Sequence, residues 1–487
     1  MVLRDHAGDM EWTYSQFNAR AAALAHWLTG ELGIRKGDRV VVFAKNRAET
    51  VLLYAACVKT GIILVPLNFR LMPRELDGLL KDAEPAAFFF EDEFADLVEQ
   101  IPSLNSVSNR HSYSTLEPFL LNDPGEVNET IPAEPISEDD VVMILYTAGS
   151  TGVPKGAMIT HRMLFWNSIN TGLRLDLTSG DHTQSFAPFF HTGGWNVLLT
   201  PFLHHGGSHT LLEKFDPALI LKLMEQERTT LLFGVPTMLQ MMAECPEFDE
   251  VDLSSVRYAV VGGAPMPEPL INRWHDKGIF IRQGYGLTEV GPNCFSLHQD
   301  DAIRKRGSIG FPNYYIDAKI AGADGNDVGV NTPGELWLRS PVVTPGYWRR
   351  PDATAEAITG GWFHTGDVVQ RDDEGFVYVV DRKKNMFISG GENVYPADVE
   401  RFLYTHPAVR EVAVIGVKDD KWGEVGKAYV SLNPDTTLKP EELIQFCKGQ
   451  LAGYKTPKHV VFLDDLPKND AGKINRLALQ KDHESGT

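Results

Sequence analysis

The chain has 487 residues, of which 43% are hydrophobic and 23% are charged. This length exceeds what one hydrophobic core supports, so two or more domains are expected, and the composition excludes a disordered tail or a membrane bundle. Acidic residues outnumber Lys plus Arg by 65 to 46, and the resulting formal charge of -19 disfavours nucleic acid and anionic lipid as partners.

The first third alternates short apolar runs with helical periods, which indicates parallel α/β architecture. Strands are expected at residues 39–44, 62–66 and 86–90, and helices at 49–59 and 73–83, followed by a polar, irregular surface segment over 105–136. In the middle of the chain, residues 231–235 and 258–263 read as strands that end in glycines. Ligands of parallel sheets lie beyond the carboxyl ends of such strands.

From about Ile316 the pattern changes to shorter strands, at 334–339 and 375–380. A compact tail follows, with helices at 397–404 and 440–451 and strands at 411–417 and 428–432. We therefore predict an α/β fold: a large N-terminal domain of parallel α/β sheets with a β-rich subdomain (1–380), and a small α+β C-terminal domain (381–487).

The cysteines and the N-terminus bear on location. Cys57, Cys245, Cys294 and Cys447 stand far apart with no C-x-x-C pair, which is typical of a reducing compartment. The first residues are charged and lack the apolar stretch of a signal peptide, and no apolar run reaches transmembrane length. A cytoplasmic protein without an integral membrane segment is expected.

The stretch most informative about function is Leu145 to Met158, L-Y-T-A-G-S-T-G-V-P-K-G-A-M. Glycines, hydroxyl side chains and one Lys suit a loop that binds phosphates through backbone N–H groups. It is not a Walker A loop, because Pro154 precedes the Lys and Gly156 follows it. The plain alternative is a solvated Gly/Ser turn.

This stretch resembles the phosphate loop of the adenylate-forming superfamily, which includes acyl-CoA synthetases, adenylation domains of peptide synthetases and firefly luciferase. It departs from the usual Y-T-[ST]-G-[TS]-T-G-x-P-K-G only at Ala148, where a hydroxyl is common. The resemblance implies an ATP-binding set of Thr147, Ala148, Gly149, Ser150, Thr151, Gly152 and Lys155, with Thr147 also at the metal.

Two further segments in the middle of the chain resemble superfamily motifs. Gln283 to Glu289 resembles Q-x-Y-G-x-T-E, which implies that Tyr285 flanks adenine, Thr288 meets the α-phosphate and Glu289 holds Mg²⁺; a hard cation prefers carboxylate oxygen. Gly262 to Pro265 resembles the loop beside adenine. Alone, the first segment would favour a surface turn whose acid begins a helix, a reading that its pairing with the phosphate loop reverses, and the plain alternative for the second is a tight turn. The implied nucleotide contacts here also include Gln283, Gly284, Gly286, Gly263 and Ala264.

The remaining motifs follow in the expected order. The sequence G-W-x-x-T-G-D implies that Asp367 accepts the ribose hydroxyls, and D-R-x-K-N implies a hinge at Asp381 and a nucleotide contact from Arg382, although Asn385 replaces the usual Asp. Gly390 and Gly391 resemble the loop that faces the thiol tunnel. Lys473, in P-[KR]-x-x-x-G-K, is implied as the catalytic lysine, since an ammonium stabilises charge on the α-phosphorus. Isolated residues of these kinds are usually solvated.

The acyl site is read from Ser185 to Thr200, which contains no carboxylate. An amino-acid substrate requires an acid for its ammonium, which disfavours a peptide-synthetase domain. By resemblance, His191 stands at the gate beside the acid and is counted as catalytic, and Trp195 is either a gating residue or core packing. Gly262 and Gly284 complete the predicted acid site.

The resemblance implies an AMP-forming acid–thiol ligase that uses ATP, Mg²⁺ and coenzyme A. A fatty acid is the expected substrate, with an aryl-CoA ligase for benzoate, hydroxycinnamate or succinylbenzoate as the alternative. Two further alternatives are a nucleotide sensor, which the presence of Lys473, Glu289 and Asp367 disfavours, and a luciferase-like oxygenase. The chain is expected to be a monomer or a homodimer.

Overall fold

The computed structural model describes residues 2–8, 10–122, 124–125, 135–147, 154–264, 266–448, 450–469 and 472–485. The chain folds into two compact units. Unit 1 comprises Met1–Arg306, Gly310–Asp317 and Leu338–Phe363, and unit 2 comprises Gly307–Ile309, Ala318–Trp337 and His364–Thr487. Unit 2 therefore joins β-rich segments to the C-terminal tail, and the domain boundary expected at Asp381 stays a prediction.

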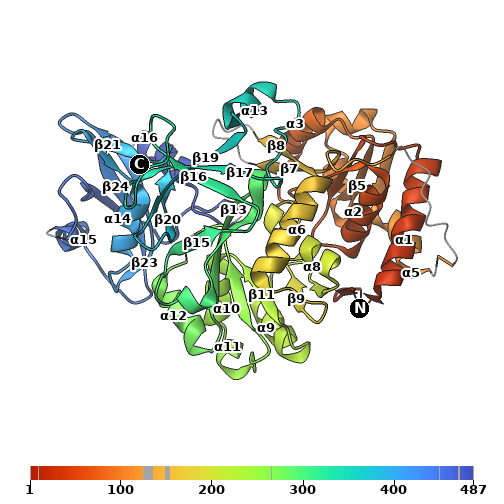
Figure 1. Cartoon of the computed structure of the whole chain (residues 1–487), viewed down its shortest axis with the longest axis horizontal. Helices are drawn as coiled ribbons and strands as arrows, with labels where there is room; N and C mark the ends of the chain where they lie inside the picture. The colour runs from red at the N-terminus through yellow and green to blue at the C-terminus, as the bar shows by residue number, and fades with distance from the viewer. Residues whose placement is uncertain are drawn as a thin grey trace. The chain divides into compact units, whose positions relative to one another are not determined.

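The first sheet of unit 1 has the strand order β6-β5-β3-β4-β7-β8. Its strands are β3 (Arg39–Phe43), β4 (Ile63–Leu67), β5 (Ala87–Phe90), β6 (Asn109–Ser112), β7 (Val141–Thr147) and β8 (Lys155–Thr160). All neighbours pair in parallel except β7 and β8, which are antiparallel. Figure 1 shows helices α1 (Tyr14–His26) and α2 (Ala48–Thr60) beside this sheet.

Local sequence signals explain the helices that connect these strands. Helix α2 ends at Gly61, whose φ of 72° lies in the left-handed region that glycine adopts without strain. Helix α3 (Pro73–Ala83) begins with proline at its first position, where no backbone donor is required. The strands and helices expected over the first 90 residues are confirmed.

The expectation of an irregular segment over 105–136 is wrong in its first half. Strand β6 pairs in parallel with β5, and helix α5 (Glu117–Leu121) follows it. The strand reads Asn-Arg-His-Ser, which carries no apolar alternation. Its pairing is therefore set by the exposed edge of β5 rather than by a pattern in its own sequence.

A second sheet supplies the edge on which the middle motifs lie. Strands β11 (Leu231–Gly234), β12 (Tyr258–Val261) and β13 (Ile281–Leu287) are parallel, and β14 (Gly291–Ser296) runs antiparallel to β13 and to β15 (Ser308–Pro312). Gly234 pairs with Val261, and Val261 pairs with Gln283. The carboxyl ends of the three parallel strands thus meet at one edge, and the strands expected at 231–235 and 258–263 are confirmed.

A third sheet and several helices complete unit 1. The sheet has the order β2-β1-β10-β9, formed by Met10–Trp12, Leu3–Asp5, Ser208–Leu211 and His182–Ser185. The helices are α4 (Ala95–Val98), α6 (His161–Leu175), α7 (Thr192–Asn196), α8 (Leu199–His205), α9 (Pro217–Gln226), α10 (Pro236–Glu244), α11 (Glu247–Glu250), α12 (Glu268–Asp276) and α13 (Pro351–Ala357), with the short strand β18 (Ile358–Thr359).

Unit 2 holds two groups of strands. The first has the order β20-β19-β17-β16, from Val377–Arg382, Trp362–Arg371, Gly334–Arg339 and Asp317–Ala321. The second has the order β22-β21-β24-β23, from Glu392–Val394, Phe387–Ser389, Gly423–Leu432 and Val409–Asp419, with β25 (His459–Phe462) beside β24. Helices α14 (Pro396–Leu403), α15 (Pro440–Cys447) and α16 (Arg476–Glu484) complete it. The expected elements are confirmed, although α15 ends four residues before the expected Leu451.

All four cysteines are free, and three of them, Cys57, Cys294 and Cys447, are buried, whereas Cys245 is partly exposed. Among the described residues, no helix combines the length and the apolar character that crossing a membrane requires.

Candidate active site

The predicted phosphate loop is framed by the β7–β8 hairpin. Thr147 and Lys155 are cross-strand partners, and the Thr147 hydroxyl donates to the Lys155 carbonyl at 3.3 Å. Tyr146 anchors the first strand, because its hydroxyl donates to the Asp82 carboxylate at 2.8 Å. The expected phosphate contacts Ala148, Gly149, Ser150, Thr151 and Gly152 lie outside the described residues.

A backbone segment beside β8 joins this hairpin to Glu289. The Met158 N–H donates to the Gly346 carbonyl at 3.1 Å, and the Trp348 N–H donates to the Gly156 carbonyl at 2.7 Å. On the same segment, the Thr344 N–H donates to the Glu289 carbonyl at 2.7 Å. Residues 344–348 therefore connect the strand that carries Lys155 to the turn that carries Glu289.

Tyr347, on this segment, contacts both predicted site residues, and the sequence analysis did not identify it. Its hydroxyl donates to Glu289 Oε1 at 3.0 Å. The Lys155 ammonium lies 5.3 Å from the centroid of its ring, within the range of a cation–π interaction. The sequence signal is a Gly-Tyr-Trp string far from both motifs, and no spacing rule links it to them.

Thr288 and Glu289 begin the short 3-10 turn (Thr288–Val290) that joins β13 to β14. Gly286 is required there, because a Cβ atom would lie 2.3 Å from the Gly291 carbonyl oxygen. Tyr285 packs edge-on against Phe295, with ring centroids 5.9 Å apart. The close backbone approach at Gly286 fixes the direction in which this turn presents Glu289.

Small residues follow the carboxyl ends of the parallel strands, as expected. Gly262, Gly263 and Ala264 come directly after β12, and Gly263 has a φ of 83°. Gly284 lies on β13 beside this loop, since a Cβ atom on Gly262 would be 3.5 Å from the Gly284 carbonyl oxygen. Gln283 is buried on the same strand. Pro265 lies outside the described residues.

The predicted acyl segment reaches this edge through helix α7. His191 immediately precedes α7. A Cβ atom on Gly193 would lie 3.3 Å from the ring of Phe233 on β11. Side chains tie the helix in place, since Asn167 of α6 donates to the Asn196 carbonyl at 2.7 Å and Asn293 of β14 donates to the Val197 carbonyl at 3.2 Å. His191 therefore lies at the start of a helix whose C-terminal end is hydrogen-bonded to α6 and to β14, the strand that follows the turn of Glu289.

Trp195 lies in the core. Its side chain is fully buried and stacks on Phe189 at 4.5 Å and against Tyr54 at 5.0 Å. The indole N–H donates to the Phe189 carbonyl at 2.5 Å. Core packing accounts for each of these contacts, and the gating role of Trp195 stays a prediction without support from its surroundings.

In unit 2, Asp367 and Arg382 are cross-strand partners on β19 and β20. Asp367 is buried, and one carboxylate oxygen lies 2.5 Å from the Arg382 Nε. The preceding Thr365 hydroxyl donates to the Leu336 carbonyl at 2.7 Å, which anchors the strand. The structure thus places an anion and a cation side by side at the predicted ribose site.

Lys473 lies on a tight turn of unit 2. Its N–H donates to Asn469 Oδ1 at 3.0 Å, and its carbonyl accepts from the Asn469 N–H at 2.7 Å. The side chain keeps an exposed surface, yet desolvation by the surrounding protein lowers the pKa of Lys473, nearby Arg382 lowers it further and Asp367 opposes the change. The charges of Arg382 and Asp367 therefore act on Lys473 in opposite directions.

Asp381 fixes the start of α14. Its carboxylate accepts from the Arg382 N–H at 2.6 Å, the Asn385 amide at 3.0 Å and the Ala397 N–H at 2.8 Å. Asn385, which replaces the usual acid of the motif, is thus used as a donor to Asp381.

Gly390 and Gly391 form the turn between β21 and β22, with φ of 61° and 87°. A Cβ atom on Gly390 would lie 2.7 Å from the Trp422 ring, whereas one on Gly391 would meet nothing within 4 Å. The exposed Trp422 therefore packs directly on this glycine turn.

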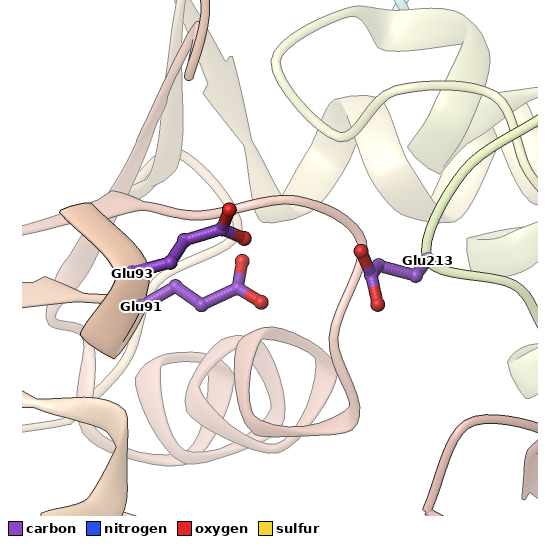
Figure 2. A group of neighbouring side chains, drawn as sticks. All are labelled: Glu91, Glu93 and Glu213. Carbon is purple, nitrogen blue, oxygen red and sulfur yellow. The ribbon is translucent and has the colours of Figure 1, made fainter.

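Figure 2 shows a separate acidic cluster of unit 1, in which Glu91 and Glu93 lie side by side and Glu213 faces them. One ligand atom from each lies within 4.8 Å of the others. The Lys45 ammonium already contacts Glu93 and lies 2.9 Å from Glu213, and Arg47 lies 3.3 Å from Glu91. These contacts form an ion-pair network in which protein cations neutralise the carboxylates.

Comparisons with known proteins identify the family of this chain. The AMP-binding enzyme family matches residues 2–348, and the AMP-binding enzyme C-terminal domain matches residues 398–473. A feruloyl-CoA synthase of Amycolatopsis sp is 42% identical over 96% of this chain and 93% of its own length. The long-chain-fatty-acid–CoA ligase FadD13 of Mycobacterium tuberculosis is 34% identical over 98% of this chain and 94% of its own.

A solved structure, the o-succinylbenzoate coenzyme A synthetase of Bacillus subtilis in complex with ATP and magnesium ion, superposes with a TM-score of 0.85. The two chains are 31% identical, and the match covers 98% of this chain and 96% of the synthetase chain. The chain belongs to the AMP-binding enzyme family. It is an acid–thiol ligase, a class of adenylate-forming enzyme that uses ATP, Mg²⁺ and coenzyme A.

Proposed function

We propose that this ligase converts an apolar aryl acid of the hydroxycinnamate type into its CoA thioester. The composition of the edge beside His191 supports the apolar character of the acid. The segments that meet there (185–200, 233–239 and 262–264) contain no carboxylate. An acid that carries an ammonium would lack a partner, because an unpaired buried charge is costly. The feruloyl-CoA synthase, at 42% identity, favours the aryl class.

In the proposed site, Glu289 and Thr147 hold the magnesium ion of MgATP. A carboxylate and a hydroxyl are the oxygen ligands that this hard cation prefers, so the residues fit the ion. The bound ion neutralises phosphate charge. Lys155 and Thr288 bind phosphate oxygens. Tyr285 and the loop at Gly263 bind adenine.

We assign the ribose and catalytic roles to unit 2. Asp367 accepts the ribose hydroxyls, and Arg382 and Lys473 together supply more positive charge than Asp367 neutralises. That surplus suits an anionic ligand, and in this proposal the Lys473 ammonium stabilises charge at the α-phosphorus.

The reaction proceeds in two displacements. A carboxylate oxygen of the acid attacks the α-phosphorus, and the bond to pyrophosphate breaks. The sulfur of coenzyme A then attacks the acyl carbon, AMP leaves with the bonding electron pair, and the thiol proton passes to solvent. No residue of this chain is acylated, so its contribution is positioning and charge stabilisation.

The test measures both halves with a panel of acids. Exchange of labelled pyrophosphate into ATP and formation of the CoA thioester are followed with ferulate, coumarate, benzoate, succinylbenzoate, octanoate and palmitate. We expect kcat/KM for a hydroxycinnamate to exceed that for any fatty acid by at least about tenfold, a difference of about 1.4 kcal/mol. Glu289→Gln should abolish both halves, and Glu250→Gln, an exposed acid in α11, is the matched control. A complete lack of exchange with every acid sinks the proposal.

The second candidate is a fatty acyl-CoA synthetase, which the sequence analysis placed first. The 34% identity to FadD13 over nearly the whole chain favours it. In the same assay, a preference for palmitate or octanoate over every aryl acid would replace the first candidate with this one.

We also propose that Asp381 is the pivot between the two half-reactions. One of its three accepted hydrogen bonds comes from Ala397 at the start of α14, so we expect a change at Asp381 to alter the orientation of the tail. Asp381→Pro should impair thioester formation more than pyrophosphate exchange, and equal loss of both refutes the pivot.

The four free cysteines support a proposed cytoplasmic location. A monomer or homodimer remains our proposal for the assembly.

A further inference from the structure

We infer that Tyr347 is a positioning residue that holds the Glu289 carboxylate for the magnesium ion of MgATP and keeps the Lys155 ammonium apart from that carboxylate. The inference rests on the proposed role of Glu289. Within the described residues, this phenol is the side-chain partner shared by the predicted metal ligand and the predicted phosphate-binding lysine.

The Tyr347 backbone is fixed from two sides. It forms an antiparallel bridge with Ala157 of β8, and its N–H donates to the Thr354 hydroxyl of α13 at 2.9 Å. The preceding Gly346 has a φ of 142°, and a Cβ atom there would lie 2.4 Å from Thr354 Cγ2. The ring therefore starts from a backbone that has little freedom to move.

The hydroxyl sets the orientation of Glu289. A carboxylate on a short turn has several rotamers, and holding one of them costs side-chain entropy. The 3.0 Å hydrogen bond from Tyr347 to Oε1 selects one orientation before the ligand arrives. A hydrogen bond to a charged group contributes more than one between neutral groups, so its loss should appear in metal binding.

The ring performs the second task. Lys155 and Glu289 have opposite charges, and a direct ion pair between them would withdraw both from the phosphates and the metal. The Lys155 ammonium instead lies over the ring face, while the hydroxyl at the ring's edge binds Glu289. The phenol thus gives each charge a partner that leaves its net charge available to the ligand.

The two tasks are separable by mutation. Tyr347→Phe removes the hydroxyl and keeps the ring face, whereas Tyr347→Leu removes both. Tyr315→Phe is the matched control, because Tyr315 is a tyrosine of the same unit whose ring packs on Trp166 at 4.7 Å. All three variants should unfold thermally within a few degrees of the wild-type chain.

The experiment measures the binding of Mn²⁺·ATP without any acid, by electron paramagnetic resonance of free Mn²⁺. We expect Tyr347→Phe to weaken Mn²⁺ binding in the presence of ATP about tenfold. Tyr347→Leu should in addition weaken the binding of metal-free ATP, and Tyr315→Phe should change neither. In a Glu289→Gln background, Tyr347→Phe should have no further effect, because its partner carboxylate is already absent.

Two outcomes overturn the inference: unchanged Mn²⁺·ATP binding in Tyr347→Phe, or an equal further loss when Glu289 is already changed. The second would show a general structural role for Tyr347. A wild-type chain that exchanges no pyrophosphate with any acid sinks the proposed function instead. Since metal binding is measured without the reaction, the two failures are distinguishable.

Discussion

Replacing Arg476 with methionine should strongly destabilise unit 2. Arg476 Nη2 lies 2.6 Å from both carboxylate oxygens of the buried Glu400, and this carboxylate also accepts the Val414 N–H at 2.7 Å. The pair joins α16 to α14 and β23. Arg476→Met leaves Glu400 buried without its cation, a change that typically costs about 3–5 kcal/mol. For a unit of this size, that corresponds to a fall in Tm of roughly 10 °C.

The pH dependence of this loss has a definite sign. Burial raises the pKa of Glu400 and Arg476 opposes the rise. In the variant the opposition is gone, so the folded-state pKa lies further above that of the unfolded chain and the folded state binds the extra proton. The destabilisation should therefore be largest at high pH and shrink as the pH falls through the raised pKa.

Differential scanning calorimetry from pH 8 down to about pH 5, with hydrogen exchange at the Val414 amide, measures both effects. Asp465→Asn is the control: it breaks a pair with Arg410 of the same 2.6 Å length, but the Asp465 side chain is 78% exposed, so a loss below about 1 kcal/mol is expected. Equal losses in the two variants, or a loss that grows as the pH falls, would refute the importance of burial at Glu400.

Three further outcomes are expected. Gly286→Ala should lower pyrophosphate exchange more than about tenfold, because its Cβ would lie 2.3 Å from the Gly291 carbonyl oxygen. In Gly284→Ala the nearest atom would lie 3.8 Å from the new Cβ, so this variant should fold with an unchanged Tm. Burial, and to a smaller extent the charge of the nearby His182, lowers the pKa of His209 from 6.5 to about 3. The chain should therefore lose stability as the pH falls below 6.5, by up to about 1.4 kcal/mol per pH unit. His209→Gln should flatten the Tm profile in that range, and an unchanged profile contradicts this assignment. Because the pKa of Lys473 is lowered, exchange should decline at a pH below the ordinary lysine value, and Lys473→Arg should move the decline of any residual activity upward.

Local signals in the sequence predicted most of the helices and strands. The features that the sequence did not predict depend on contacts between residues far apart in the chain. Pro73 and Gly61 mark helix ends because their backbone preferences act on the residue itself. Strand β6 has no such signal, since the edge of β5 induces it. Trp195 carried two interpretations because its neighbour Tyr54 lies far away in the sequence.

The candidate site shows the same division. Motif order indicated Glu289, Lys155, Asp367 and Lys473, and their roles stay predictions. Tyr347 lies 58 residues from its partner Glu289. Its contact depends on how residues 344–348 pair with β8, which the sequence does not reveal.

The four cysteines have a consequence for an enzyme that makes a mixed anhydride. An acyl-adenylate acylates any thiolate within reach, and a thiolate forms in quantity only as the pH approaches the pKa of the thiol. Burial raises the pKa of all four thiols, that of Cys447 to about 11. The protein's own sulfur thus stays protonated and unreactive at neutral pH, so the activated acyl group is reserved for the thiol that arrives as substrate.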